Sequence, residues 1–181
     1  MKRNNENLQY YSALGFYKQG NKLARKINKK IGNEQFELVS VSTVCYSFST
    51  ELLLKLLIHI VLKQAINNEH KLEKLFNKLP AECKAEIEEK YQQKKKLENK
   101  KLKPIKLGFN SDFGNKENSK NENNITVLNI TELLKIHNES FVKWRYLYEI
   151  KGNEFYYFEF NFKLMDDFIN SVIEVIEGKI K

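Results

Sequence analysis

The chain has 181 residues, of which 41% are hydrophobic and 12% aromatic, enough for one domain (residues 1–181) with an ordinary core. Its two cysteines, Cys45 and Cys83, are too few for a disulfide framework and lack metal-ligand spacing, which excludes a disulfide-rich secreted protein or a cysteine-bound zinc site. Because residues 3–6 are polar, we expect no signal peptide and a cytoplasmic protein, with a formal net charge of +8.

The positive charge is concentrated in two segments. Residues 1–30 and residues 90–106 each carry a net charge of +7, and the remainder of the chain is acidic. Such segments can bind nucleic acid or another anionic surface. Nearly all of these residues are lysines, and together with the abundant Asn and Ile they are also typical of an AT-rich genome, in which charged faces are simply solvated. Both interpretations stay open.

The first predicted helix covers residues 7–30. Its apolar side recurs at steps of three and four residues, at Ala13, Phe16, Gly20, Leu23 and Ile27. Lysines occupy the other side, and Gly32-Asn33 is a good helix end.

The second predicted helix covers residues 37–66 and is followed by Asn67-Asn68. Its long apolar stretch resembles a membrane span, but Glu51, Lys55 and His59 interrupt it. Each of these would cost about 2.5 kcal/mol at a bilayer centre if charged. We therefore expect the central helix of a soluble bundle that does not contact a membrane.

Two shorter helices and a long connection follow. The third helix holds residues 72–79, and Pro80 either ends it or opens the fourth, in which Cys83, Ile87 and Tyr91 share one face. Both cysteines therefore lie on apolar faces and are expected in the core. Residues 103–124 lack periodicity, so we expect a polar connection there.

The fifth predicted helix starts at Asn129, where Asn129 and Glu132 can form a capping box and Leu128 can pack on Leu133. It continues as one helix to Tyr148. A sixth covers residues 155–177, although its aromatic start, residues 155–160, could form a strand instead. The predicted fold is an all-α, up-and-down bundle of five to six helices.

A polar row crosses the apolar second helix. Ser47, Glu51, Lys55 and His59 are spaced by four, so they lie nearly above one another. In one interpretation Glu51 and Lys55 form a surface pair beside a groove. In the other, the row faces a cleft or a second copy and holds a ligand, because unpaired charges are costly to bury.

His137 and Arg145 form a second candidate group, about two helical turns apart on the fifth helix with Phe141 between them. Arg145 can pair with Glu149 and stack on an aromatic ring, or it can contact a phosphate and stack on bases. His70 can hydrogen-bond across the loop that precedes the third helix.

Common catalytic signatures are absent from the sequence. There is no Gly-rich phosphate loop, no His-Glu-x-x-His zinc motif and no nucleophile elbow. We expect neither a cofactor nor a metal ion.

Two segments resemble the HEPN superfamily, the "higher eukaryotes and prokaryotes nucleotide-binding" helical domains. Glu51-Leu52-Leu53-Leu54-Lys55-Leu56-Leu57 is similar to the family's Glu-x3-Lys helix, and Glu69-His70-Lys71-Leu72 to its His-Asp-Leu segment, with Lys71 in place of the acid. Residues 141–149 also look like the late helix of some members. The resemblance covers about residues 8–177 and implies a bundle of about five helices that often dimerises through its polar faces.

Many HEPN members are metal-independent ribonucleases of toxin–antitoxin or antiphage systems, with Arg and His four to six residues apart on one helix. No arginine of this chain is followed by histidine at that distance. The resemblance therefore implies a homodimeric module that binds RNA, a nucleotide or a partner such as an antitoxin or a nucleotidyltransferase. The alternative is a ribonuclease with a rearranged site, using His137 or His59 as base and Arg145 or Lys55 for phosphate. The candidate site residues are Glu51, Lys55, His59, His70, His137 and Arg145.

Overall fold

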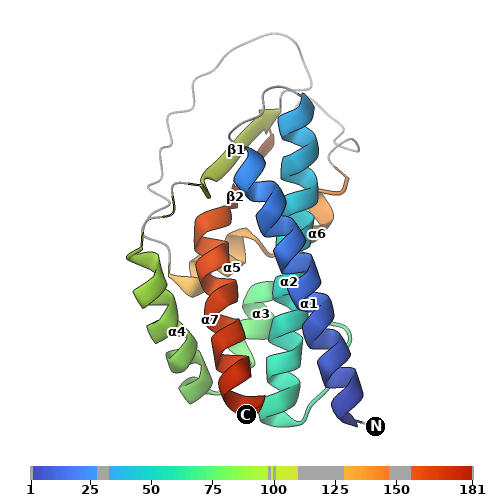
Figure 1. Ribbon diagram of the computed structural model, residues 1–181, viewed down its shortest axis with the longest axis vertical. Coiled ribbons are helices and arrows are strands. Elements are labelled where there is room, and N and C mark those ends of the chain that lie inside the picture. Colours follow the sequence, from blue (N-terminus) through green and yellow to red (C-terminus); the bar gives the residue numbers. More distant parts are fainter. Residues whose placement is uncertain are drawn as a thin grey trace.

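The computed structural model describes residues 2–27, 33–97, 99, 101–109, 129–146 and 156–180. These residues form a helical bundle, as predicted (Figure 1). Its elements are α1 (Lys2–Ile27), α2 (Asn33–Leu62), α3 (Leu72–Asn77), α4 (Ala81–Lys95), β1 (Pro104–Phe109), α5 (Ile130–Ile136), α6 (Ser140–Lys143), β2 (Tyr156–Asn161) and α7 (Phe162–Ile180).

Helix α2 is the centre of the bundle and contacts α1, α3, α6 and α7. Its middle is apolar on almost every side, and Leu54, Leu56, Leu57 and Ile58 are fully buried. The stretch Glu34–Leu62 is long and apolar enough to cross a membrane, but 61% of its most apolar window is buried inside the bundle. Such burial is typical of the central helix of a soluble protein.

Helix α1 packs closely along α2 because small residues line their contact. A Cβ atom added to Gly20 would lie 2.9 Å from Cδ2 of Tyr46 and 3.0 Å from Cβ of Cys45. Ser42 donates its hydroxyl hydrogen to the Gly20 carbonyl at 2.7 Å, and Ser49 donates to the Ala13 carbonyl at 2.8 Å. The apolar stripe predicted for this helix thus faces α2. Cys45 is a buried free thiol, and so is Cys83 on α4.

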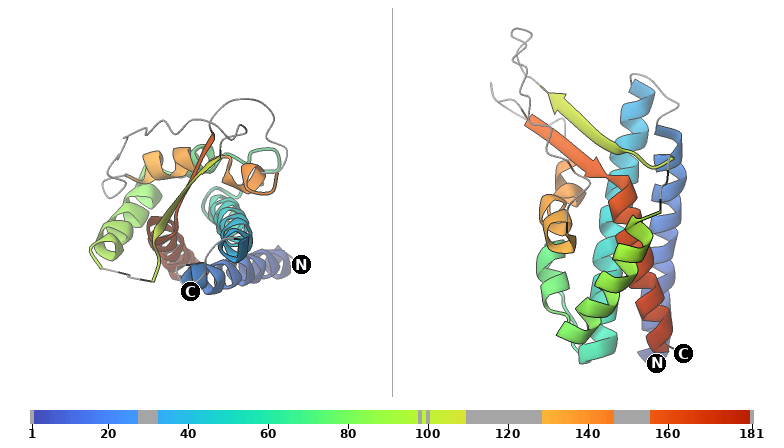
Figure 2. Two further views of the ribbon diagram at one scale, coloured as in Figure 1. Left: turned by 90° about the horizontal axis from the view of Figure 1, so that it is seen from above. Right: turned by 90° about the vertical axis from the view of Figure 1, so that its left-hand side faces the viewer.

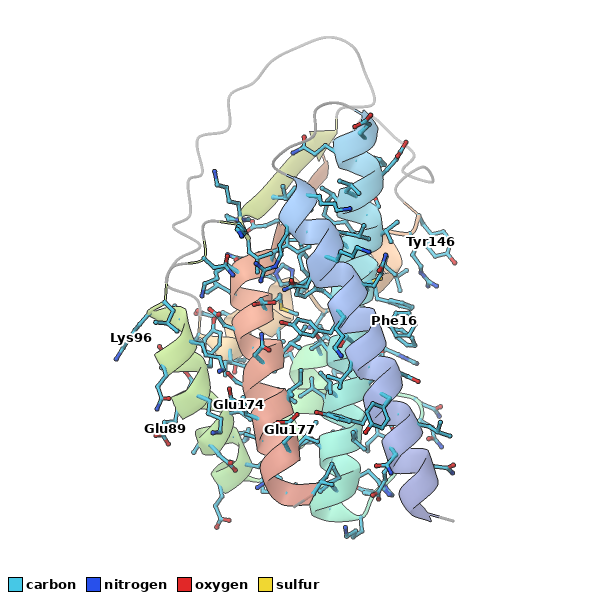
Figure 3. All side chains as sticks on the ribbon, viewed as in Figure 1. Phe16, Glu89, Lys96, Tyr146, Glu174 and Glu177 are labelled. Atoms are coloured by element: carbon cyan, nitrogen blue, oxygen red, sulfur yellow. The ribbon has the colours of Figure 1, made fainter. Side chains whose placement is uncertain are left out.

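Helix α7 packs between α2 and α4, and charged residues join it to α4. Lys90 Nζ lies 3.5 Å from Glu174 Oε2, Lys94 binds the same carboxylate, and Lys179 pairs with Glu86 at 3.1 Å. Figure 3 shows Glu174 on the side of α7 that faces α4. Two lysines of the basic segment at residues 90–106 are therefore paired within the molecule.

The prediction of a polar connection throughout residues 103–124 is wrong for its first part. Residues 104–109 form β1, which pairs antiparallel with β2, so the strand alternative is confirmed for residues 156–160, while residue 155 lies outside the described residues. Ile105 lies opposite Phe160 in this register, and both are buried. Strand pairing satisfies the backbone of both segments while it buries these side chains. Figures 1 and 2 place the ribbon at the end of the bundle opposite the start of α1 and the end of α7. Residues 110–128 lie outside the described residues.

The predicted single fifth helix is two helices, α5 and α6. The capping box at its start is confirmed, since Asn129 Oδ1 accepts from the Glu132 backbone N–H at 2.9 Å and Glu132 Oε2 accepts from Asn129 N–H at 3.2 Å. Leu128, which we expect to pack on Leu133, lies outside the described residues. The helix breaks after Ile136, where Asn138 turns to α3 and binds both the backbone N–H and the carboxylate of Glu73.

The central helix also ends earlier than predicted, at Leu62. Lys63 has a φ of 55°, in the left-handed region, and its N–H donates to the His59 carbonyl at 2.9 Å. This left-handed residue closes the helix before Asn67-Asn68. Pro80 directly precedes α4, so of the two predicted roles it opens the fourth helix.

Candidate functional site

Two residues of the polar row of α2, Lys55 and His59, line a cavity between α1 and the segment that precedes α3, whereas Ser47 is buried and its hydroxyl has no hydrogen-bond partner among the described residues. Glu51 is 5% exposed, and the side chains of Lys55 and His59 are 13% and 33% exposed. We define the polar cleft by residues of α1, of α2 and of the loop before α3, namely Glu6, Gln9, Glu51, Lys55, His59 and His70.

Glu51 is the centre of the polar cleft. Lys55 Nζ donates to Glu51 Oε1 at 2.8 Å, and His70 Nδ1 lies 2.9 Å from the same oxygen. The pair expected between Glu51 and Lys55 is therefore present, and it is joined by a histidine from another element. A carboxylate this deeply buried needs such partners to offset its lost hydration.

His70 contacts Glu51 through one ring nitrogen, and most of its side chain is exposed. Its Nδ1 faces Glu51, so Nε2 lies on the other side of the ring, and the side chain is 70% exposed. A carboxylate on one ring nitrogen fixes the orientation of an imidazole and leaves the other nitrogen for a donor or an acceptor. Glu51 thus positions one cation and one exposed imidazole.

His59 lies on α2, one helical turn after Lys55, and faces α1. Its Nε2 is 3.2 Å from Glu6 Oε1, and Gln9 donates to the Leu52 carbonyl at 2.9 Å. A cavity of about 280 Å³ opens at this point. It is lined by Asn5, Glu6, Gln9, Lys55, His59, Ala65, Ile66 and Asn67.

His137 lies outside the polar cleft, in the core. It is 1% exposed, its Nε2 accepts from the Asn161 backbone N–H at 3.3 Å, and its ring packs on Phe160. Burial lowers the pKa of His137 to about 3. This histidine is a neutral core residue that holds α5 to the end of β2.

Arg145 is exposed and also lies apart from Glu51. Its guanidinium carbon is 4.2 Å from the ring centroid of Phe141 and 5.1 Å from that of Tyr146. The expected aromatic stacking is present, whereas the expected partner Glu149 lies outside the described residues. His137 and Arg145 do not share a helix, because the chain turns between α5 and α6.

Sequence reasoning missed the contribution of α1 to the site. Glu6 and Gln9 complete the cavity, and Glu6 is the single acid among residues 1–30. An isolated acid in a basic segment was the available signal, but only the packing of α1 on α2 shows that it meets His59.

A second buried polar group, centred on Asp166 of α7, was also missed. Its Oδ1 accepts from the hydroxyls of Tyr17 and Tyr46 at 2.7 and 3.0 Å and from the amide of Asn21. Burial, followed by the charge of Asp166, raises the pKa of both tyrosines. The signal was the acidic pair Asp166-Asp167 within an otherwise apolar stripe. These contacts join α1, α2 and α7, so we regard the group as structural.

Within the ranges that the structure describes, no group of three or more His, Cys, Asp or Glu side chains could hold a metal ion. Comparisons with protein-family models, with curated proteins and with solved structures give no match. The polar cleft brings one lysine and two histidines together with the carboxylates of Glu51 and Glu6.

Proposed function

We propose that this chain is a HEPN-like, cytoplasmic, homodimeric module that binds RNA or a nucleotide through the polar cleft. The convergence of Glu51, Lys55 and His70 supports this proposal most directly. Two of the three segments that carry the resemblance meet in the folded chain, where Lys55 and His70 both contact one carboxylate oxygen of Glu51. A bacterial or phage defence or toxin–antitoxin setting, with an antitoxin or a nucleotidyltransferase as partner, belongs to the same proposal.

The chemistry of the cleft fits a phosphate-bearing ligand. Lys55 and His59 line the cavity of about 280 Å³, and the exposed ring of His70 lies beside Lys55's partner Glu51. An ammonium group and imidazole N–H groups are donors suited to phosphate oxygens. The chain lacks the family's usual arginine and histidine pair, which supports binding without cleavage by that site.

Binding can be measured by fluorescence anisotropy with labelled tRNA, an mRNA fragment and ATP. We expect Lys55→Gln and His59→Gln each to weaken binding about tenfold, through loss of one charge-assisted contact. Lys135→Gln, which removes a charge from an exposed position of α5, is the matched control. Thermal melts verify that each variant is folded. Absence of binding by the unmodified protein, or an equal effect of all three changes, would contradict the proposal.

The homodimer is tested separately by sedimentation equilibrium of the purified chain. We expect a mass of twice 21.5 kDa at micromolar concentration. A monomer across the whole concentration range would remove dimerisation from the proposal and leave the ligand question to the binding measurements.

A ribonuclease is the second candidate, favoured by the fact that His59 and Lys55 line one cavity. His59 would take the proton of a ribose 2′-hydroxyl, and Lys55 would stabilise the charge on the phosphate. The version that uses His137 is disfavoured, because that imidazole is buried and already accepts a backbone N–H. Cleavage of labelled tRNA in EDTA that disappears in His59→Ala would establish this candidate over the binding module. Intact RNA at every protein ratio would eliminate it.

A further inference from the structure

One side of helix α1 faces away from the bundle. The opposite side packs on α2 through Ala13 and Gly20, and Figures 1 and 2 show α1 at the edge of the molecule. Five exposed residues on the outward side follow one another at alternating steps of three and four, so they form a single line along the helix. We call them the outer line of α1, and they are Leu8, Tyr11, Gly15, Lys18 and Lys22.

The first part of the outer line is apolar. Leu8 is 66% exposed and Tyr11 is 68% exposed, although the Tyr11 ring also contacts that of Tyr10 at a centroid distance of 5.7 Å. Single exposed apolar residues are common on soluble proteins. Two large ones that begin a line with heptad spacing are typical of a helix face that packs on another helix.

Gly15, at the middle of the outer line, is a point where another backbone can approach α1 closely. Glycine destabilises the interior of a helix relative to alanine, so it is expected where a neighbour leaves no room for a side chain. Gly20 of the same helix has such a neighbour in Tyr46 of α2. A Cβ atom at Gly15 would meet no described atom within 4 Å, so no described part of the chain is the neighbour that would require this glycine.

The last part of the outer line is basic. Among the residues that the structure describes, no carboxylate forms an ion pair with Lys18 or Lys22, whereas Lys90 and Lys94 share the carboxylate of Glu174. A segment that lies along the whole line therefore needs apolar side chains at one end and acidic side chains at the other, because interfaces between proteins are complementary in charge.

A second copy of this chain does not match the outer line. Two α1 helices packed in parallel would place lysines against lysines, and two packed antiparallel would place lysines against Leu8 and Tyr11. Both arrangements leave the lysines without acids and bring like charges together or bury a charge against apolar side chains, which is costly. A helix with acidic residues from another protein satisfies both ends of the line at once.

We propose that the outer line of α1 is a docking surface for an acidic amphipathic helix of a partner protein. The partner helix lies along α1, with apolar side chains on Leu8 and Tyr11, its backbone near Gly15, and Glu or Asp side chains on Lys18 and Lys22. The line is about 21 Å long, which four turns of a partner helix cover. This inference goes beyond the proposed function, because none of these residues belongs to the polar cleft.

The test measures the binding of two fluorescein-labelled helical peptides to the whole chain by anisotropy. One peptide carries two Leu, one Ala and two Glu at successive heptad positions, in the order that matches the outer line, and the other has Gln in place of Leu. We expect the Leu peptide to bind about tenfold or more tightly than the Gln peptide, because it buries two leucine side chains.

Two glycine variants test the close approach at the middle of the line. Gly15→Leu should weaken binding of the Leu peptide about tenfold or more, because the added side chain occupies the space of the peptide backbone. Gly178→Leu is the matched control, since Gly178 is an exposed glycine of α7 that also has nothing within 4 Å of its Cβ. It should change the affinity less than twofold.

Two lysine variants test the charge complementarity. Lys22→Glu should weaken binding of the Leu peptide about tenfold, because it places like charges opposite each other. Lys135→Glu makes the same change at an exposed lysine of α5, outside the outer line, and should weaken binding less than twofold. Thermal melts verify that all four variants are folded.

The other outcomes overturn the proposal. No binding of the Leu peptide, equal affinity for the two peptides, or equal effects within either pair of variants shows that the outer line is not this docking surface. A dimer in sedimentation equilibrium that Gly15→Leu dissociates assigns the line to a second copy instead. Sedimentation with phosphatidylserine vesicles that Lys22→Glu abolishes, without peptide binding, assigns it to a lipid surface. Ligand binding at the polar cleft is measured with other variants and is not affected by these outcomes.

Discussion

Burial decides what His137 can do. The residue type suggests acid–base chemistry, but the core surrounds the ring, and its Nε2 already accepts a backbone N–H from Asn161. Because desolvation lowers its pKa to about 3, the imidazole is neutral in the folded protein across the usual pH range. His70 and His59 differ in that they lie at the surface and face carboxylates.

The protein should lose stability in acid through His137. An unfolded histidine has a pKa of about 6.5, so between about pH 6.5 and 3 the unfolded chain binds a proton that the folded chain does not. The free energy of unfolding should therefore decrease, by up to about 1.4 kcal/mol per pH unit, as the pH falls through this window, with no contribution above it. Urea denaturation at several pH values measures this. His137→Gln, which cannot titrate, should show a shallower decrease, and identical slopes would refute the assignment.

Two glycines of α1 should respond oppositely to the same change. A Cβ at Gly20 would meet the Tyr46 ring, Cys45 and the Ser42 carbonyl, whereas a Cβ at Gly15 has nothing within 4 Å. Gly20→Ala should lower the free energy of unfolding by about 1–3 kcal/mol through overpacking. Gly15→Ala should raise it by about 0.5–1 kcal/mol, since alanine loses less entropy in a helix. Urea denaturation of both variants decides this, and a stabilised Gly20→Ala would mean that the helices are farther apart.

At the scale of elements, two tyrosine–carboxylate hydrogen bonds join α1 to α7, one to a buried carboxylate and one at the surface. Tyr17 and Tyr10 each donate a hydroxyl to a carboxylate of α7 at 2.7 Å, to Asp166 and to Glu177. Asp166 is buried and also binds Tyr46 of α2, while the bond to Glu177 is exposed. The inner bond therefore determines how α1, α2 and α7 fit together.

Removal of the two hydroxyls should show this difference. We expect Tyr17→Phe to lower the free energy of unfolding by about 1–3 kcal/mol, because it removes one of the three hydrogen bonds that a buried carboxylate oxygen accepts. Tyr10→Phe, whose bond is open to water, should lower it by less than about 0.5 kcal/mol. Thermal and urea unfolding of the two variants give the comparison. Equal losses would show that the Asp166 group is as well hydrated as the surface pair.

At the scale of the whole molecule, tertiary structure changes the meaning of the positive charge. Lys90 and Lys94 of the second basic segment share the carboxylate of Glu174, so one positive charge of that segment is offset by a surface ion pair within the chain. Lys101 is exposed, and so are Lys18, Lys22 and Lys26 of α1. The surface available to an anionic polymer is therefore smaller than the net charge of +8 suggests.

RNA affinity should fall steeply with salt if these exposed lysines contribute. We expect the dissociation constant to rise about tenfold or more between 50 and 200 mM potassium chloride, because bound lysines displace counterions from the phosphates. Lys101→Gln should reduce the slope of log affinity against log salt by about 1, and Lys90→Gln should reduce it less. Anisotropy titrations at several salt concentrations measure both. A flat salt response would show that the basic segments are solvated faces.

Local patterns in the sequence determined most of the helices. The recurrence of apolar residues predicts α1, α2 and α7, and the Asn129 and Glu132 capping box predicts the start of α5, because these features depend on neighbours a few residues away. The spacing of Glu51 and Lys55 likewise predicts their ion pair, since residues four apart in a helix are adjacent.

Only the tertiary structure decided which distant residues meet. The strand β1 exists because β2 pairs with it, the break between α5 and α6 follows from the contact of Asn138 with Glu73, and Glu6 reaches His59 because α1 packs on α2. Both histidines are candidate site residues in the sequence, but His137 is buried in the core, while His70 contacts Glu51. Helical periodicity specifies the face on which a side chain lies, but the partner of that face depends on packing between segments far apart in the chain.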